Sequence, residues 1–399
     1  MQEPEPPMAD LVLDPFTALP RDAAAAALAG RVWHPEHGGP CVVAVRDGAL
    51  HDLSAHFPTM RDLCEHPNPA EALRATPGSR IGDLHEVLRN TPEETRNCGI
   101  AWLLAPIDLQ SIKAAGVTFA ISMLERVIEE RARGDAAAAT QIRAEITRLV
   151  GEDFSKLKPG SAEAMHLKQV LVGQNAWSQY LEVGIGPDAE IFTKAPSMAA
   201  VGTGSDAGIH PKSSWNNPEP EVVVVVASDA RIVGATLGND VNLRDVEGRS
   251  ALLLGKAKDN NASCALGPFI RFFDDGFGLD QVRSMELRLS VDGPEGYRLE
   301  GASSMRKISR DPADLVEQMI NPNHQYPDGA VLFLGTLFAP VEDRDVPGQG
   351  FTHKIGDIVS VSAPELGTLT NRIRHSCDCA PWTYGASHLM RHLAARGLL

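Results

Sequence analysis

Three carboxylates stand at the ends of two apolar segments in the middle of the chain. Glu219 and Glu221 lead into a run of five valines, and Asp240 ends the next apolar segment, RIVGATLGND. Residues two apart on a strand point to the same face and lie roughly 6–7 Å apart, so Glu219 and Glu221 present their side chains together. A chain that runs up one strand and back along the next brings Asp240 to the same end.

Burying like charges side by side costs several kcal/mol per ion unless a cation or a proton compensates. Three carboxylate oxygens, with no His or Cys among them, suit a hard divalent ion such as Mg²⁺, Mn²⁺ or Ca²⁺. Pro218 and Pro220 remove two backbone donors, so we expect this segment at the beginning or edge of its strand. The alternative is that Glu219 and Glu221 are solvated residues at the mouth of a strand.

Further motifs follow in an order that resembles the fumarylacetoacetate hydrolase family. NDVNLRD contains Asp240, Lys258 lies nine residues before a Gly-Pro turn, and Gly-Thr and Gly-Asp turns follow at Thr336 and Asp357. The resemblance covers about residues 100 to 373. It implies that Glu219, Glu221 and Asp240 hold Mg²⁺, or Mn²⁺ in its place.

One segment departs from the hydrolases of that family. They carry a stretch like GxNYxxHxxE, whose His and Glu activate the water that cleaves a carbon–carbon bond. The matching stretch here is GVTFAISMLE, in which Ser122 stands at the histidine position and Glu125 remains. A serine is no base near neutral pH, which argues against hydrolysis, although another histidine could take that place in space.

Two other segments, DAEIFTKAPSM and SSWNNPEPE, resemble the branch of the family that dehydrates 2-keto-3-deoxy sugar acids. This resemblance implies that Glu190 and Lys258 share the catalysis, one removing the C3 proton and the other assisting loss of the C4 hydroxyl, with the order left open. Desolvation beside a cation would lower the pKa of Lys258 from about 10.4. The resemblance also implies substrate contacts from Thr336, Ser214 and Lys194.

Each of these residues has a plainer explanation. Glu190 or Lys258 would then be a solvated loop residue, Gly335-Thr336 a simple turn, and Lys194 a member of a local ion pair. The motifs together favour a Mg²⁺-dependent hydro-lyase that converts a 2-keto-3-deoxypentonate to 2,5-dioxopentanoate through a C4–C5 enol. One alternative is a Mg²⁺-dependent acylpyruvate or diketo-acid hydrolase, with Glu125 or Glu190 positioning water. The other is a non-catalytic binding protein with the same fold.

The elements that position these residues predict an α+β fold with a mostly β catalytic domain. The resemblance implies a β-roll at residues 106–399, ending in a helix at about 381–399, and a smaller N-terminal α/β domain at 1–105 with a flexible lead-in. Local patterns predict a short Ala-rich helix at 22–29, a hairpin at 39–54 and helices in TMRDLCEH and AEALRAT. Residues 121–154 have the spacing of two helices broken near Gly134.

Composition narrows the range of partners. The chain has 399 residues and a formal net charge of −15, with no basic patch, which disfavours nucleic acid and anionic membrane as partners. No apolar run approaches the roughly 20 residues that span a bilayer. The acidic, Pro-rich start is unlike a signal peptide, and the six cysteines are scattered, so we expect a cytoplasmic protein in which Cys377 and Cys379 are an incidental pair. The partner expected is a small 2-keto acid, and the family implies a homodimer.

Overall fold

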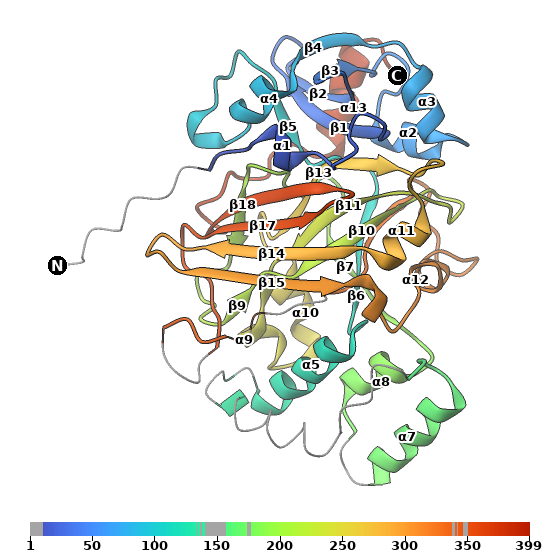
Figure 1. Cartoon of the computed structure of the whole chain (residues 1–399), viewed down its shortest axis with the longest axis vertical. Helices are drawn as coiled ribbons and strands as arrows, with labels where there is room; N and C mark the ends of the chain where they lie inside the picture. The colour runs from blue at the N-terminus through green and yellow to red at the C-terminus, as the bar shows by residue number, and fades with distance from the viewer. Residues whose placement is uncertain are drawn as a thin grey trace, which may run out of the picture.

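The computed structural model describes residues 11–133, 135, 138–139, 157–173, 177–336, 340, 342–345 and 350–399. Within α5 (Ala120–Ala132), four side chains are also outside the described part: those of Ala120, Ile121, Ser122 and Leu124. Two sheets form the middle of the molecule, and helices α5, α7 (Ala162–Gly173) and α8 (Gln179–Ile185) lie at the end opposite the N-terminal strands (Figure 1).

A large mixed sheet contains both the N-terminal strands and the strands that carry the carboxylates. In the described part of the chain its order is β4-β3-β2-β1-β13-β11-β10-β16-β6-β7, with β5 paired to β1. The strands are β1 (Leu28–His34), β2 (Gly39–Arg46), β3 (Ala49–Asp52), β4 (Ser79–Asp83), β5 (Trp102–Leu104), β6 (Ser111–Gly116), β7 (Glu190–Ala195), β10 (Pro220–Val226), β11 (Ile232–Asp240), β13 (Cys264–Phe272) and β16 (Ala330–Phe333).

A smaller sheet packs against the large one. Its order is β15-β14-β17-β18-β8, and its front strands cross the middle of Figure 1. The strands are β8 (Asp206–Ile209), β14 (Glu286–Asp292), β15 (Arg298–Ser304), β17 (Ile358–Ala363) and β18 (Gly367–His375). Two short strands, β9 (Asn216–Asn217) and β12 (Asn242–Leu243), pair with each other beside the carboxylates.

The valine run of β10 explains why the large sheet is buried on both faces. Val222, Val224 and Val226 belong to a core shared with the small sheet, whereas Val223 and Val225 belong to a core with the N-terminal part. All five side chains are fully buried. Because alternate residues on a strand point to opposite faces, a continuous apolar run is what a strand between two cores requires.

Helices cover the sheets at several places. The remaining helices are α1 (Pro15–Ala18), α2 (Met60–Glu65), α3 (Pro69–Ala75), α4 (Leu84–Asn90), α9 (Arg244–Glu247), α10 (Leu254–Lys258), α11 (Leu279–Ser284), α12 (Pro312–Met319) and α13 (Ala386–Ala395). Helix α13 packs against β2, so the C-terminal helix lies beside the N-terminal strands at the top of Figure 1. No helix of the described part is long and apolar enough to cross a bilayer.

Most local predictions are confirmed, and one is wrong. The hairpin is β2 and β3 around Asp47-Gly48, helices α2 and α3 occupy the two expected patches, and α13 lies within the expected C-terminal helix. The Ala-rich segment is not a helix: residues 22–25 form turns, Ala26 forms a bend, and residues 28–34 form β1. Pairing of β1 with β2, β5 and β13 overrides the helix propensity of alanine here. The second helix expected before residue 154 falls largely outside the described residues.

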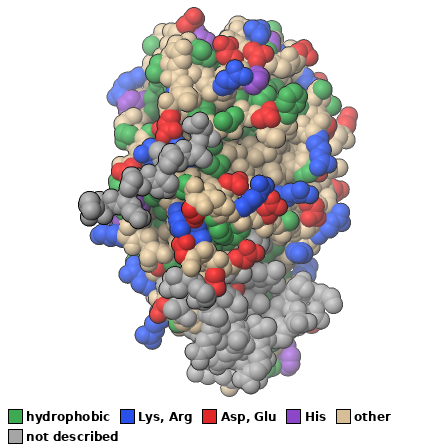
Figure 2. Space-filling model, turned by 60° about the vertical axis from the view of Figure 1, so that its left-hand side comes forward, with side chains coloured by type: hydrophobic (Ala, Val, Ile, Leu, Met, Phe, Trp, Pro, Cys, Tyr) green, Lys and Arg blue, Asp and Glu red, His purple; other side chains and the backbone are tan. Residues whose placement is uncertain are grey.

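The observed sheets agree with the expected α+β class. Strand β1 pairs with β13, so residues on both sides of the expected boundary at 105 share one sheet. The division into an N-terminal domain at residues 1–105 and a catalytic domain at residues 106–399 stays a prediction. On the face shown in Figure 2, acidic and basic side chains are interspersed over the surface.

Candidate metal centre and active site

Strands β10 and β11 bring the three predicted carboxylates together at one end of their pair. Glu221 lies opposite Gly238, and the backbone N–H of Asp240 donates to the Glu219 carbonyl at 3.0 Å. One carboxylate oxygen from each of the three side chains lies within 4.8 Å of the others. Each residue is at most 2% exposed, so the three acids converge in a site almost removed from solvent.

The charges of this cluster fit a bound cation. Among the described residues, no cationic side chain forms an ion pair with Glu221, whose Oε2 accepts from the Gly335 N–H at 2.7 Å. Burial, together with Asp240 and Glu219, raises the pKa of Glu221 well above its usual value. A divalent cation would replace the proton that Glu221 otherwise takes up, and oxygen ligands are those that Mg²⁺ prefers.

Two lysines contact the same carboxylates. Lys258, at the end of α10, forms ion pairs with Glu219 and with Asp240, the latter at 3.1 Å. Lys194 of β7 is completely buried and lies 2.7 Å from the other Asp240 oxygen, and it also donates to the carbonyls of Val241, at 3.2 Å, and of Lys258. Lys194 therefore contacts a metal-ligand candidate and helps to hold α10 in place.

The expected lowering of the Lys258 pKa depends on a bound cation and stays a prediction; the carboxylates by themselves shift this pKa in the other direction. Burial alone would lower this pKa, but the nearby carboxylates of Asp240, Glu219 and Glu247 outweigh burial and raise it. Lys258 is thus an ammonium donor. A divalent cation on Glu219 and Asp240 would compete with this ammonium for the same oxygens.

Glu190 begins β7, where its Cα pairs with Gly116 at the end of β6. A Cβ at position 116 would lie 2.2 Å from Glu190 Oε2, so the close approach of this carboxylate requires glycine. Desolvation and the nearby Glu247 raise the pKa of Glu190 to about 7, although Arg126 and Lys258 act in the opposite direction. A carboxyl with this pKa can take up or release a proton near neutral pH.

A small cavity of about 20 Å³ joins these groups. Its lining consists of Ala115, Gly116, Val117, Arg126, Glu190, Phe192, Glu219, Glu221, Asp240, Glu247, Lys258 and Thr336. Thr336, one of the three substrate contacts that the resemblance implies, thus lines this cavity. Ser214 does not: it is exposed on the loop before β9, and its N–H donates to Asp245 at 3.0 Å.

The sequence model of one protein family, described as the fumarylacetoacetate hydrolase C-terminal region, matches residues 160–374 of this chain. The match covers more than half of the chain and includes the three carboxylates and Lys258. This chain belongs to the fumarylacetoacetate hydrolase family. The family predicted from the motifs is therefore confirmed. The predicted α+β fold class is confirmed as well.

Two relatives and one solved structure resemble this family member. A 2-dehydro-3-deoxy-D-arabinonate dehydratase of Saccharolobus solfataricus is 30% identical over 185 residues, 46% of this chain and 58% of that protein. A probable 2-keto-3-deoxyxylonate dehydratase of Haloferax volcanii is 29% identical over 194 residues, 49% of this chain and 63% of that protein. Each match thus spans less than two thirds of the relative's length.

The solved structure is a 2-keto-3-deoxy-D-arabinonate dehydratase complexed with magnesium and 2,5-dioxopentanoate. It has 22% sequence identity and a TM-score of 0.58, and the superposition covers 87% of this chain and 99% of that one. At this identity the likeness supports a common fold.

In this family member a network of buried charges that the sequence analysis missed connects α5 to the carboxylates. Arg126 forms ion pairs with Glu219, with Glu129 at 2.6 Å and with Glu247 at 2.9 Å. Arg244, almost fully buried, continues the network to Glu129 at 2.7 Å and to Glu125 at 3.1 Å. A signal exists in the sequence, since Arg126 and Glu129 are three apart on a helix, but such charges usually mark a solvated face.

The network bears on the hydrolase alternative. Glu125 is paired with Arg244 and is not part of the cavity lining. The side chain of Ser122 lies outside the described residues. Arg126, in contrast, lines the cavity and contacts a metal-ligand candidate, so α5 supplies a cation to this cavity.

Proposed function

We propose that this protein is a Mg²⁺-dependent hydro-lyase that removes water from a 2-keto-3-deoxypentonate and yields 2,5-dioxopentanoate. The observation that carries the proposal is that Glu190 and Lys258 line the same cavity as Glu219, Glu221 and Asp240. Its relatives are named as dehydratases of such sugar acids, which supports the same reaction class. Mn²⁺ is a candidate substitute for Mg²⁺, because both take oxygen ligands.

Glu219, Glu221 and Asp240 would hold the cation, which when bound acts as a Lewis acid that stabilises the enolate of the 2-keto acid. The chain itself must then move protons at C3, at the departing C4 hydroxyl and at C5. The reaction removes a proton from C3 and hydroxide from C4, which leaves a C3–C4 double bond conjugated with the ketone. Moving a proton from C5 to C3 gives the C4–C5 enol, and ketonisation of this enol gives the aldehyde.

Glu190 and Lys258 are suited to different halves of this chemistry. With a pKa of about 7, Glu190 is partly ionised at neutral pH and can accept the C3 proton. Lys258 lines the same cavity and its ammonium group has protons to donate, so we assign it the proton that leaves with the C4 hydroxyl. Thr336 lines the cavity and would orient the anionic substrate, and Arg126 would hold Glu219 in position.

The test is product analysis with the purified full chain, Mg²⁺ and two substrates in parallel, 2-keto-3-deoxy-D-arabinonate and an acylpyruvate, each with and without chelator. We expect metal-dependent 2,5-dioxopentanoate from the sugar acid and no pyruvate from the acylpyruvate. Pyruvate release with the sugar acid untouched would overturn the proposal in favour of hydrolysis.

Solvent deuterium exchange at C3 separates the two catalytic roles. Glu190→Gln should lose both exchange and elimination, whereas Lys258→Met should keep exchange and lose elimination, with kcat lowered about 10²- to 10⁴-fold in each. Asp188→Asn and Lys256→Met are matched controls, because these residues are exposed close by in the sequence. The opposite pattern of exchange would reverse the assignment.

A further inference from the structure

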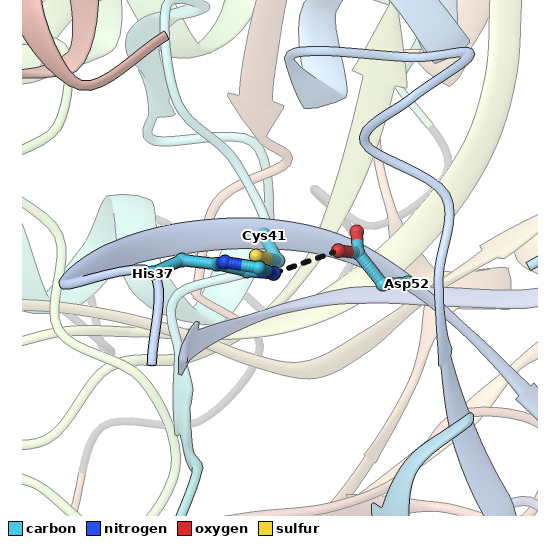
Figure 3. A group of neighbouring side chains, drawn as sticks. All are labelled: His37, Cys41 and Asp52. Carbon is cyan, nitrogen blue, oxygen red and sulfur yellow. Dashed lines mark ion pairs between the residues drawn. The ribbon is translucent and has the colours of Figure 1, made fainter. Parts of the chain in front are cut away.

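A second group of metal-binding side-chain types lies in the N-terminal strands, away from the carboxylate cavity. One ligand atom each from His37, Cys41 and Asp52 lies within 4.8 Å of the others. His37 Nε2 is 3.8 Å from Asp52 Oδ2. Figure 3 shows the His37 ring and the Asp52 carboxylate directed toward each other, with the Cys41 side chain next to the ring.

The register of the strands explains why these side chains converge. Cys41 and Val43 are two apart on β2 and therefore share a face of the sheet, and Asp52 of β3 pairs with Val43. Cross-strand partners point to the same side, so Cys41 and Asp52 are diagonal neighbours. The turn between β1 and β2 then places His37 over that same face.

Two further histidines approach the group. The His34 ring stacks on His37 with 4.3 Å between centroids, and His34 Nδ1 is buried with no hydrogen-bond partner among the described residues. His392 of α13 packs on Gly39, where a Cβ would lie 2.3 Å from His392 Nδ1. Its Nε2 is likewise buried and without a partner in the described part of the chain. Buried polar atoms of this kind usually have partners. We therefore take each of these two ring nitrogens as a candidate metal ligand.

A positively charged side chain already contacts two of these three residues. The Arg396 guanidinium donates to Cys41 Sγ at 3.2 Å and to Asp52 Oδ2 at 3.3 Å. Arg396 follows the last residue of α13, and its side chain is 17% exposed. It can therefore turn toward solvent when another cation takes its position.

We propose that His37, Cys41 and Asp52 form a second metal site, for a borderline-soft divalent ion of the Zn²⁺ type, with His34 or His392 as the fourth ligand. Imidazole, thiolate and carboxylate in a tetrahedral set are the ligands that Zn²⁺ takes in proteins. Binding replaces the Cys41 thiol proton, which leaves to solvent, and displaces Arg396. The bound ion would link β2 to β3 through Cys41 and Asp52. With His392 as the fourth ligand it would also link these strands to α13.

Co²⁺ absorption tests this site in the full chain. The protein is stripped with a chelator, given excess Mg²⁺ to occupy the carboxylate site and titrated with Co²⁺. We expect a near-ultraviolet thiolate-to-Co²⁺ charge-transfer band that Zn²⁺ abolishes. Cys41→Ser should lose the band, and Cys98→Ser, at an exposed cysteine, should keep it. A wild-type protein with no thiolate band, or a band that survives in Cys41→Ser, overturns the proposal.

Two further variants test the site without a change at the buried Cys41. His37→Asn, at an exposed position, should weaken Zn²⁺ binding by more than about tenfold, because even the loss of outer-shell partners costs about 10- to 100-fold. Arg396→Gln should tighten Zn²⁺ binding, because the competing cation is gone. Unchanged Zn²⁺ affinity in both variants would also overturn the site.

Discussion

The carboxylate centre and the His37–Cys41–Asp52 group differ in donor chemistry, in burial and in the cations that accompany them. At the carboxylate centre every donor is an oxygen, each residue is at most 2% exposed, and Lys258, Lys194 and Arg126 contact the acids. The second group mixes nitrogen, sulfur and oxygen near the surface, with Arg396 alone as the contacting cation among the described residues.

This difference in donor atoms explains how one chain could bind two different metal ions, each at its own site. Hard oxygen donors suit Mg²⁺, whereas imidazole and thiolate select softer ions. The cavity at the buried centre is lined by five acidic and two basic side chains, and a divalent ion would neutralise part of this excess of acidic groups. The surface group is close to balanced by one guanidinium, so a metal must displace it. We therefore expect catalysis to depend on the first site alone.

The largest expected effect comes from removing an oxygen ligand. Glu221→Gln should lower Mg²⁺-dependent formation of 2,5-dioxopentanoate by more than about 100-fold, since loss of an outer-shell partner already costs about 10- to 100-fold. The Co²⁺–thiolate band of the second site should be unchanged in this variant. Loss of that band together with activity would mean that the two sites are not separate.

The next largest expected effect is the pH dependence of kcat that the ionisation of Glu190 would cause. If its carboxylate accepts the C3 proton, kcat should rise as the pH passes through about 7 and level off above it, as the pKa of about 7 requires. Glu190→Gln should lose this limb along with most of its activity. A wild-type kcat that falls through the same range would assign Glu190 as the acid.

The same residue makes a prediction about stability. The raised pKa means that the folded protein binds this proton more tightly than the unfolded chain, so Glu190 lowers stability as the pH rises from about 4.5 to about 7. Glu190→Gln should therefore raise Tm above pH 7 and change it little below pH 4.5. An equal shift of Tm at both pH values would contradict this account.

A smaller effect is expected from Arg126, which holds Glu219 from outside the ligand set. Arg126→Gln should raise the Mg²⁺ concentration for half-maximal activity by about 10- to 100-fold, and Arg126→Lys should recover part of this loss. Titration of activity with Mg²⁺ measures the shift. If kcat fell with no change in the Mg²⁺ requirement, Arg126 would act on the substrate rather than on Glu219.

The smallest effect is expected at Ser214, which is exposed and outside the cavity lining. Ser214→Ala should change KM less than about twofold and the free energy of unfolding by less than about 0.5 kcal/mol, as at most surface positions. A large rise in KM measured with the sugar acid would bring the loop before β9 into the active site.

The strands and the carboxylates could be predicted from the sequence for a local reason. A buried strand reveals itself by consecutive apolar residues, and Glu219, Glu221 and Asp240 flank two such runs that must pair. The motif spacing that places Lys258 before Gly-Pro is likewise carried by a short stretch of chain. The prediction of a helix in the Ala-rich segment was wrong because the pairing of β1 with distant strands outweighed helix propensity. The local sequence carries no information about that pairing.

Other features depended on contacts between distant segments. Arg126 and Glu219 are 93 residues apart, and on the sequence Arg126 is one charge on a charged helix. Cys41 and Arg396 are 355 residues apart, so nothing local indicated that the hairpin and the C-terminal helix meet. The sequence by itself determined which acids cluster at the strand ends and the family motifs around them. Only the tertiary structure decided which cations face those acids and the pKa values that follow, because burial and charge pairing depend on the whole packed chain.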